Sequence, residues 1–245
     1  MPAAGGVSIG HLLGGRVSYV QPTNGFRSGI EPVLLAAAVP ARPGERVLEA
    51  GTGAGAALLC LGARIPGLAG LGVERDPALA ALAERNFAAN GFAPRFSVSC
   101  ADIAALPEIG RFDHAFANPP WHAPSGTGSP DPAREAAKRA APGLLAAWAE
   151  RLAARLRPRG SLTLILPAGS LPRGLDALGA AGCGSAALLP LWPKPGRPAR
   201  LILVQGVKDA GGAFRVLPGL TLHRAEGGYT EAAEAVLRHG APIRL

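Results

Sequence analysis

One apolar stretch in the middle of the chain ends so sharply that it fixes where a strand must stop. Residues 112–117 (Phe-Asp-His-Ala-Phe-Ala) have the composition of a buried strand, and Asn118 follows them immediately before Pro119 and Pro120. Proline cannot donate to a sheet ladder, and the residue before it avoids the helical region. Asn118 therefore lies at the carboxyl end of a predicted strand, which is where open α/β sheets bind their ligands.

The groups around this strand end suit a flat ring that carries an amino group. The Asn118 carboxamide oxygen and the Pro119 carbonyl oxygen can both accept hydrogen bonds from one amino group. Trp121, the residue after Pro120, can stack on the face of a planar base. The simpler interpretation is an ordinary Asn-Pro-Pro turn that ends a strand. The residues that precede this stretch distinguish a binding site from such a turn.

A glycine-rich turn between a short strand and a helix precedes this stretch. Residues 45–50 form the predicted strand, residues 56–64 form the apolar helix, and Gly51, Gly53 and Gly55 lie between them. Glycine lets a backbone approach a ligand closely, and a helix N-terminus presents free N–H groups. This order of elements is typical of a nucleotide-binding site.

Two further predicted strands carry a carboxylate at their ends. Glu74 follows residues 69–73 and lies 19 residues beyond Gly55, where a carboxylate can accept two hydrogen bonds from ribose hydroxyls. Asp102 follows residues 95–99 and is placed to accept a hydrogen bond from an adenine amino group. Asp102 would also serve as the N-cap of a short helix, and the two roles are compatible. We expect these four strand ends to meet at one edge of a sheet.

Composition narrows the class of protein. Of the 245 residues 48% are apolar, which supports a packed core, and the three cysteines lack the spacing of a disulfide framework or a zinc site. This pattern fits a reducing, cytoplasmic compartment, and we expect no metal. The first residues lack a basic leader, and no apolar run approaches the roughly 18 residues of a membrane-spanning helix, so we expect neither a signal peptide nor a membrane span.

The net charge of +8 and a pI of about 10.4 make a polyanion a candidate partner. Most of this charge is arginine in a chain rich in Ala, Gly and Pro, so a coding bias is an alternative explanation. Cations in loops that we expect beside the Asn118 site are candidate nucleic-acid contacts: Arg134, Lys138, Arg139, Lys194 and Arg197. Plain solvated charge is the alternative for each of them.

Taken together, these residues resemble a known family. The chain is similar to class I S-adenosylmethionine-dependent methyltransferases that methylate amino groups. More closely, it resembles bacterial tRNA adenine-N6-methyltransferases that act on an adenosine beside the anticodon of a valine tRNA. The resemblance runs from Gly25-Phe-Arg-Ser-Gly-Ile-Glu-Pro to Gly228-Tyr-Thr-Glu before the last helix. It includes Glu49-Ala-Gly-Thr-Gly-Ala-Gly and Asn118-Pro-Pro-Trp, in which Trp stands where Tyr or Phe is more usual.

The resemblance implies a Rossmann-like α/β fold with a seven-stranded, mostly parallel sheet and helices on both faces. It implies a single methyltransferase domain over residues 1–245. Within that domain, residues 1–44 would form an N-terminal extension that covers the cofactor site. Residues 45–207 would form the Rossmann-like core, and residues 208–245 would form a C-terminal extension.

The resemblance also implies S-adenosyl-L-methionine as the cofactor. Glu49 would anchor its amino group where the glycines pass its methionine part, and Asp102 with Ile103 would hold its adenine. Residues 26–31 would close over it. The implied cofactor-binding residues, in chain order, are Phe26, Arg27, Gly29, Glu49, Gly51, Gly53, Gly55, Glu74, Asp102, Ile103 and Asn118.

The implied reaction is methyl transfer to the N6 amino group of an adenine in tRNA, and its catalytic residues would be Asn118, Pro119, Pro120 and Trp121. One alternative is another substrate for the same chemistry, either ribosomal RNA or a protein glutamine, because release-factor methylating enzymes share Asn-Pro-Pro-aromatic. An NAD-binding enzyme is a second alternative, since residues 51–56 also fit Gly-x-Gly-x-x-Gly/Ala. A third is a non-catalytic nucleic-acid-binding protein.

Overall fold

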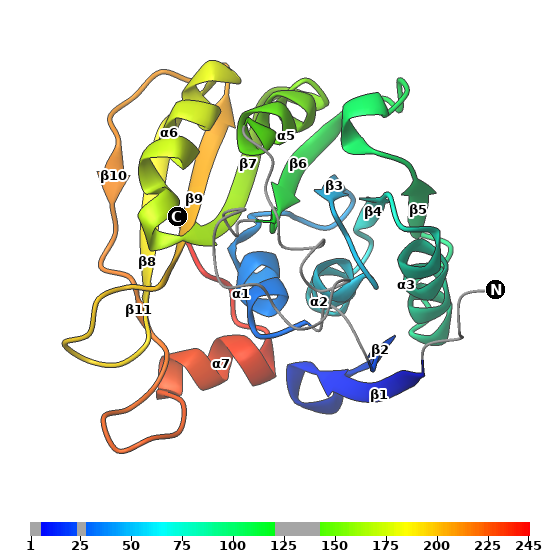
Figure 1. Cartoon of the computed structure of the whole chain (residues 1–245), viewed down its shortest axis with the longest axis horizontal. Coiled ribbons are helices and arrows are strands. Elements are labelled where there is room, and N and C mark those ends of the chain that lie inside the picture. The colour runs from blue at the N-terminus through cyan, green and yellow to red at the C-terminus, as the bar shows by residue number, and fades with distance from the viewer. Residues whose placement is uncertain (1–5, 24–27, 121–142) are drawn as a thin grey trace.

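A nine-stranded sheet forms the centre of the computed structural model, which describes residues 6–23, 28–120 and 143–245 (Figure 1). The strand order is β10-β8-β9-β7-β6-β3-β4-β5, with β11 also paired to β8. The longer strands are β3 (Arg46–Ala50), β4 (Ala69–Glu74), β5 (Phe96–Cys100), β6 (Phe112–Ala117), β7 (Leu156–Pro167), β8 (Cys183–Trp192) and β9 (Leu201–Lys208). All pairings are parallel except those of β9 with β7 and β8.

The predicted α/β class, with a mostly parallel sheet, is therefore confirmed. The sheet is wider than the seven strands expected from the sequence. Two short strands, β10 (Arg215–Val216) and β11 (Leu220–Thr221), pair with the outer edge of β8. Both come from the segment 208–245, so that segment contributes to the sheet itself.

Helices cover both faces of the sheet because its central strands are apolar on both sides, as parallel strands usually are. On one face lie α1 (Glu31–Ala38), α2 (Ala56–Arg64), α3 (Pro77–Ala89) and α7 (Glu231–His239); on the other lie α5 (Leu144–Ala153) and α6 (Leu171–Ala180) (Figure 1). Successive side chains of β3 point to opposite faces: Val47 packs with the α1, α2, α3 and α7 layer, and Leu48 packs with the α5 and α6 layer. None of the helices in the described ranges is long and apolar enough to cross a membrane.

The connection between α5 and β7 does not follow the local sequence signals. The sequence suggests a helix up to Leu156 and a turn at residues 158–160, but the helix ends at Ala153 and β7 already begins at Leu156. Pairing of β7 with β6 shifts register at this point, and Arg159 has a positive φ of 69°. Pro158 and Gly160 thus lie at an irregularity within β7, and both residue types are common at β-bulges.

An N-terminal hairpin of β1 (Val7–Leu12) and β2 (Val17–Pro22) docks on α3 through two asparagines one helical turn apart. Asn86 is almost fully buried; its side chain accepts from the Val20 N–H (3.0 Å) and donates to the carbonyl oxygens of Val20 (2.8 Å) and Ala54 (2.9 Å). Asn90 makes the matching pair with Ser18. These carboxamides serve as the hydrogen-bonding partners that a neighbouring strand would otherwise supply.

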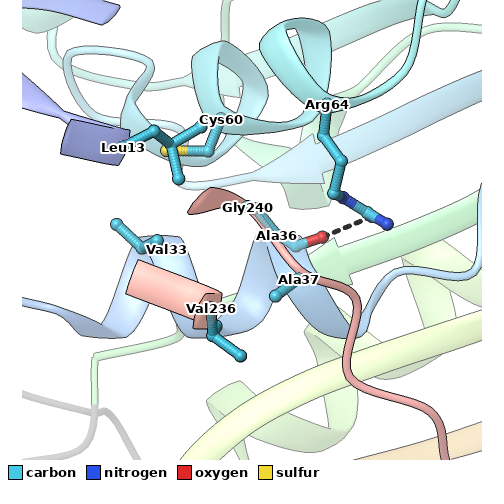
Figure 2. Close-up of a pocket in the computed structure, with 8 residues that line it drawn as sticks. All are labelled: Leu13, Val33, Ala36, Ala37, Cys60, Arg64, Val236 and Gly240. Carbon is cyan, nitrogen blue, oxygen red and sulfur yellow. Dashed lines mark hydrogen bonds between the residues drawn. The ribbon is translucent and has the colours of Figure 1, made fainter. Parts of the chain in front are cut away.

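On the α1 side of the sheet, α7 packs against α1 and against the 3-10 turn Leu13–Gly15, and residues of α2 line the gap between them. Figure 2 shows the Arg64 side chain reaching toward the end of α1. One guanidinium nitrogen donates to the carbonyl oxygens of Ala36 (2.8 Å) and Val39 (2.7 Å), groups that the end of a helix leaves unpaired. The hollow around Arg64 has no room for a water molecule, so it is a packing gap and not a ligand site.

Asn86→Ala tests this docking. The substitution leaves one N–H and two carbonyl groups without their partner in a buried position, so we expect the free energy of unfolding to fall by about 2–4 kcal/mol in urea denaturation. Asn90→Ala is the matched control, because Asn90 is half-buried and water can replace its bonds; we expect a smaller loss. Equal losses for the two variants would contradict this account.

Candidate functional site

The register of the parallel strands brings the predicted site residues to one edge of the sheet. Val73, Ala50 and Ala117 are partners across β4, β3 and β6. The next residues along these strands are Glu74, Gly51 and Asn118, which therefore follow one another across the sheet. We call these three residues the carboxyl row.

Asp102 continues this edge on the outer side of β4. It lies two residues beyond Cys100, which pairs with Glu74. Its Oδ1 accepts from the Ala104 N–H (2.8 Å), so Asp102 is the N-cap of a short 3-10 turn, Ile103–Ala105. Asp102 is exposed and Ile103 is buried beneath it. The capping role is thus present, and it uses only one of the two carboxylate oxygens.

The glycine turn after β3 depends on residues without side chains. Gly51, Gly53 and Gly55 all have positive φ, between 56° and 88°. A Cβ on Gly55 would lie 2.7 Å from the Phe87 ring, so this position also needs glycine for space. Around Gly53, in contrast, no described atom outside its two chain neighbours lies within 4 Å of the place that a Cβ would take. The backbone of Gly53 is therefore open to a ligand.

Glu74 is held in place by the turn beside it. One carboxylate oxygen accepts from the Gly53 N–H (2.9 Å) and the other accepts from the Asp76 N–H (3.0 Å). The residue is only 8% exposed. An ionised carboxylate has about four acceptor positions, so two further hydrogen bonds can be accepted from hydroxyl groups.

Glu49 lies beneath the same turn and is 4% exposed. Its carboxylate accepts from the Thr52 hydroxyl (2.6 Å). Burial, together with the charge of Glu74, raises the pKa of Glu49 to about 8. Burial also raises the pKa of Tyr19 to about 12. A cation that reached Glu49 would favour its ionised form.

The described part of the predicted covering segment is tied to the N-terminal hairpin. The Ser28 hydroxyl is hydrogen-bonded to the Tyr19 hydroxyl (2.8 Å), and the Ser28 N–H donates to the Gln21 side chain (3.0 Å). A Cβ on Gly29 would overlap the carboxylate of Glu31, so the Glu31 side chain folds back from the start of α1 toward Gly29. Phe26 and Arg27, the other predicted residues of this segment, lie outside the described residues.

At the other end of the carboxyl row, Asn118 is half-buried and Pro119 is buried. Pro120 is the last described residue of the motif. The sequence continues into residues that are not described, and these include several predicted site residues: Trp121, Arg134, Lys138 and Arg139. Lys194 and Arg197 are exposed in the turn between β8 and β9. Pro167, Leu201 and Leu191 are register partners, which puts this turn at the same edge as the carboxyl row.

Sequence reasoning missed one residue of this edge. Trp148 in α5 places the end of its ring against Gly51, 2.8 Å from where a Cβ would be. It lies 27 positions beyond Trp121, and the sequence alone does not show which strand end its helix covers. The sequence signal that could have indicated a special role was a single tryptophan in a helix composed mainly of Ala and Leu.

The amino edge of the sheet carries a different polar cluster. His114 Nδ1 lies 2.8 Å from the Ser161 hydroxyl, and its Nε2 lies 2.9 Å from a Glu45 carboxylate oxygen. The order Ser–His–Glu resembles a hydrolase triad, but Ser161 is only 4% exposed within β7. We therefore interpret the cluster as structural. Within the described ranges no three His, Cys, Asp or Glu side chains are grouped as metal ligands.

The residues of the carboxyl edge fit S-adenosylmethionine by their chemistry. The cofactor offers an ammonium group, a ribose diol and an adenine amino group, all of which are hydrogen-bond donors. Glu49, Glu74 and Asp102 are acceptors, and the backbone at Gly53 leaves the turn open between them. An acidic edge also suits a ligand with a positively charged sulfur.

The topology, with one antiparallel strand, β9, inserted between β7 and β8 of an otherwise parallel sheet, defines the class I methyltransferase fold. A predicted O-methyltransferase, Atu636 from Agrobacterium tumefaciens, has the same fold: the TM-score is 0.71 at 24% identity, over 87% of this chain and 98% of that one. The sequence profile of the methyltransferase small domain family matches residues 31–165, more than half of the chain. The chain therefore belongs to the methyltransferase small domain family.

Curated relatives include enzymes with different substrates. A tRNA1(Val) (adenine(37)-N6)-methyltransferase from Actinobacillus succinogenes is 35% identical over 146 residues, which are 58% of this chain and 61% of that protein. A release factor glutamine methyltransferase from Cereibacter sphaeroides is 34% identical over 119 residues, 46% of this chain and 42% of that protein. The match thus spans about three fifths, or less, of the length of these relatives.

The buried carboxyl of Glu49 gives stability a defined pH dependence. Its ordinary pKa is 4.5 and its folded value is about 8, so between these values the folded protein holds a proton that the unfolded chain releases. Stability of the wild type should therefore fall as pH rises through this window, by up to about 1.4 kcal/mol per pH unit.

Glu49→Gln removes this titration and keeps the size of the side chain. We expect the variant to gain stability relative to the wild type as pH rises from about 5 to about 8 in urea denaturation. Two stability profiles that run parallel across this range would show that Glu49 is already ionised in the folded protein.

Proposed function

We propose that this protein transfers a methyl group from S-adenosylmethionine to the N6 amino group of an adenine in tRNA. The observation that supports this most is the carboxyl row itself. Glu74 offers acceptors for a ribose at one end, and Asn118 followed by Pro119 offers acceptors for an amino group at the other. Only the glycine turn separates them, so a methyl donor and a methyl acceptor would meet between the two.

The chemistry assigned to this chain's residues is recognition and positioning. S-adenosylmethionine supplies a methyl group on a positively charged sulfur, which is a strong electrophile. The Asn118 carboxamide oxygen and the Pro119 carbonyl would accept the two N–H bonds of the N6 amino group. This would turn the nitrogen lone pair out of conjugation and toward the methyl group. Positioning of this kind can contribute roughly 7–11 kcal/mol to the lowering of a barrier.

Two observations favour RNA as the substrate. The relative from Actinobacillus succinogenes carries a tRNA-modifying name, and the chain has a net charge of +8. Lys194 and Arg197 lie in the turn between β8 and β9, at the same edge of the sheet as the carboxyl row. These two strands are three and two positions from β6, which is about 10–14 Å at ordinary strand spacing. A phosphate backbone next to a bound adenine lies within that distance. This substrate would place the protein in the cytoplasm, in keeping with its free cysteines.

A protein glutamine is the second candidate, because an amide nitrogen presents the same two N–H bonds to Asn118 and Pro119. The release factor glutamine methyltransferase from Cereibacter sphaeroides supports it. That match covers a smaller share of both chains than the match with the tRNA-modifying relative. We therefore rank tRNA first.

The experiment that separates these substrates uses purified protein, S-adenosylmethionine with a labelled methyl group, and total tRNA from a source that lacks the modification. Nucleoside mass spectrometry should detect N6-methyladenosine, concentrated in valine tRNA. Label that enters release factors or ribosomal RNA, with none in tRNA, would reject the tRNA proposal and keep the enzyme class.

Asn118→Ala tests the assigned chemistry. Loss of one preorganised hydrogen-bonding group should lower the turnover number by about 10²–10³ without a matching loss of cofactor affinity, measured by single-turnover kinetics and calorimetry. Asn118→Asp is the matched control, since it retains an acceptor oxygen, and should keep more activity. Wild-type turnover in Asn118→Ala would reject the mechanism.

Lys194→Ala combined with Arg197→Ala tests the phosphate contacts. If both cations meet phosphates, the affinity for tRNA should fall and the plot of log affinity against log salt should become less steep by about two. Arg85→Ala with Arg238→Ala removes the same charge from α3 and α7 and serves as control. Identical salt slopes for the two double variants would leave net charge as the explanation.

A further inference from the structure

Trp148 occupies a defined place beside the carboxyl row. Three atoms at the far end of its indole ring lie 2.8–4.0 Å from the position that a Cβ on Gly51 would take. Its helix, α5, also contacts the turn Ile103–Ala105 and β3. The tryptophan is partly buried and packs against the core between α5 and the sheet. The ring therefore forms the α5-side wall at the middle of the carboxyl row.

The order of groups in the carboxyl row determines what would face this wall. Glu74 and Asn118 lie on either side of Gly51, one strand spacing away in each direction, so they are about 10 Å apart. If Glu74 holds the ribose and Asn118 holds the methyl acceptor, the sulfur that carries the methyl group must lie between them. That position is next to Gly51, and it is the position that Trp148 borders.

We propose that the indole ring of Trp148 contacts the positively charged sulfur of S-adenosylmethionine and selects this cofactor over its neutral demethylated product. This proposal rests on the proposed function, because it assumes that the carboxyl row binds the cofactor. The chemistry is the attraction between a cation and the face of an aromatic ring, for which tryptophan is the best side chain, so the sulfur would lie over the ring and not at its end. After methyl transfer the sulfur is neutral, and this attraction is lost.

The properties of Gly51 are consistent with a contact between Trp148 and the cofactor. Its φ of 66° favours glycine, and the ring of Trp148 leaves no space for a Cβ. The end of the indole ring therefore lies in the space that a side chain at position 51 would take. A ligand that lies along the turn at Gly51 would then lie next to the ring.

Trp148→Leu tests the proposal by binding and not by activity. Calorimetry with S-adenosylmethionine and with S-adenosylhomocysteine gives two dissociation constants for each protein. We expect Trp148→Leu to weaken the binding of S-adenosylmethionine by about 10–30-fold, and that of S-adenosylhomocysteine much less. Trp148→Phe should keep most of the preference, because a phenyl ring retains an aromatic face. Trp192→Leu, in β8, is the matched control and should change neither constant.

An equal loss for both ligands would show that Trp148 is only a packing residue and would overturn the proposal. A second measurement does not depend on the leucine variant being folded. In the variant W121F/W192F, Trp148 is the only tryptophan left of three. Saturation with S-adenosylmethionine should change its fluorescence more than saturation with S-adenosylhomocysteine does.

Equal fluorescence responses to the two bound ligands would also overturn the inference. If the wild type bound neither ligand, the proposed function itself would fail. That outcome differs from a protein that binds both ligands without preference, in which only the role of Trp148 would be wrong.

Discussion

The parallel pairing of β4, β3 and β6 is the constraint on which the candidate site depends. Because the three strands run in the same direction, the residues after Val73, Ala50 and Ala117 emerge at one edge. A slip of one residue would turn every side chain of a strand to the opposite face. Because β3 is buried on both faces, its side chains do not alternate between apolar and polar, and this sequence pattern opposes a slip only weakly. The glycine turn and the hydrogen bond from the Gly53 N–H to Glu74 therefore help to fix the register.

The site combines groups that are costly to bury with groups that hold them in place. Glu49 is a buried carboxyl group whose ionised form is disfavoured, and a neighbouring cation would stabilise that form. The Gly53–Glu74 bond and the packing of Phe87 against Gly55 keep the turn in shape around it. The N-terminal hairpin adds Tyr19 to the same region, and the Ser28 hydroxyl is hydrogen-bonded to Tyr19. The acidic groups that would bind a positively charged ligand are therefore already held in position.

Much of this arrangement could be predicted from local signals. The Pro119-Pro120 stop, the glycine turn and the two carboxylates each mark a strand end, and the α/β class follows from their alternation with helices. The sequence did not reveal that β7 begins at Leu156, because Pro and Gly usually signal a turn and here accompany a shift of register. It also gave no means of placing Trp148 beside Gly51, since that contact joins residues 97 positions apart through the packing of a helix on the sheet.

A crystal structure of the protein with S-adenosylhomocysteine would show directly whether the carboxyl row binds the cofactor. We expect the ribose hydroxyls to lie within hydrogen-bonding distance of the Glu74 carboxylate, the adenine beside Asp102 and Ile103, and the sulfur next to Gly51. The open side of the sulfur should then face Asn118. An adenosyl group bound away from the carboxyl row, or a sulfur that faces away from Asn118, would contradict the central claim that this row joins a methyl donor to an amino group.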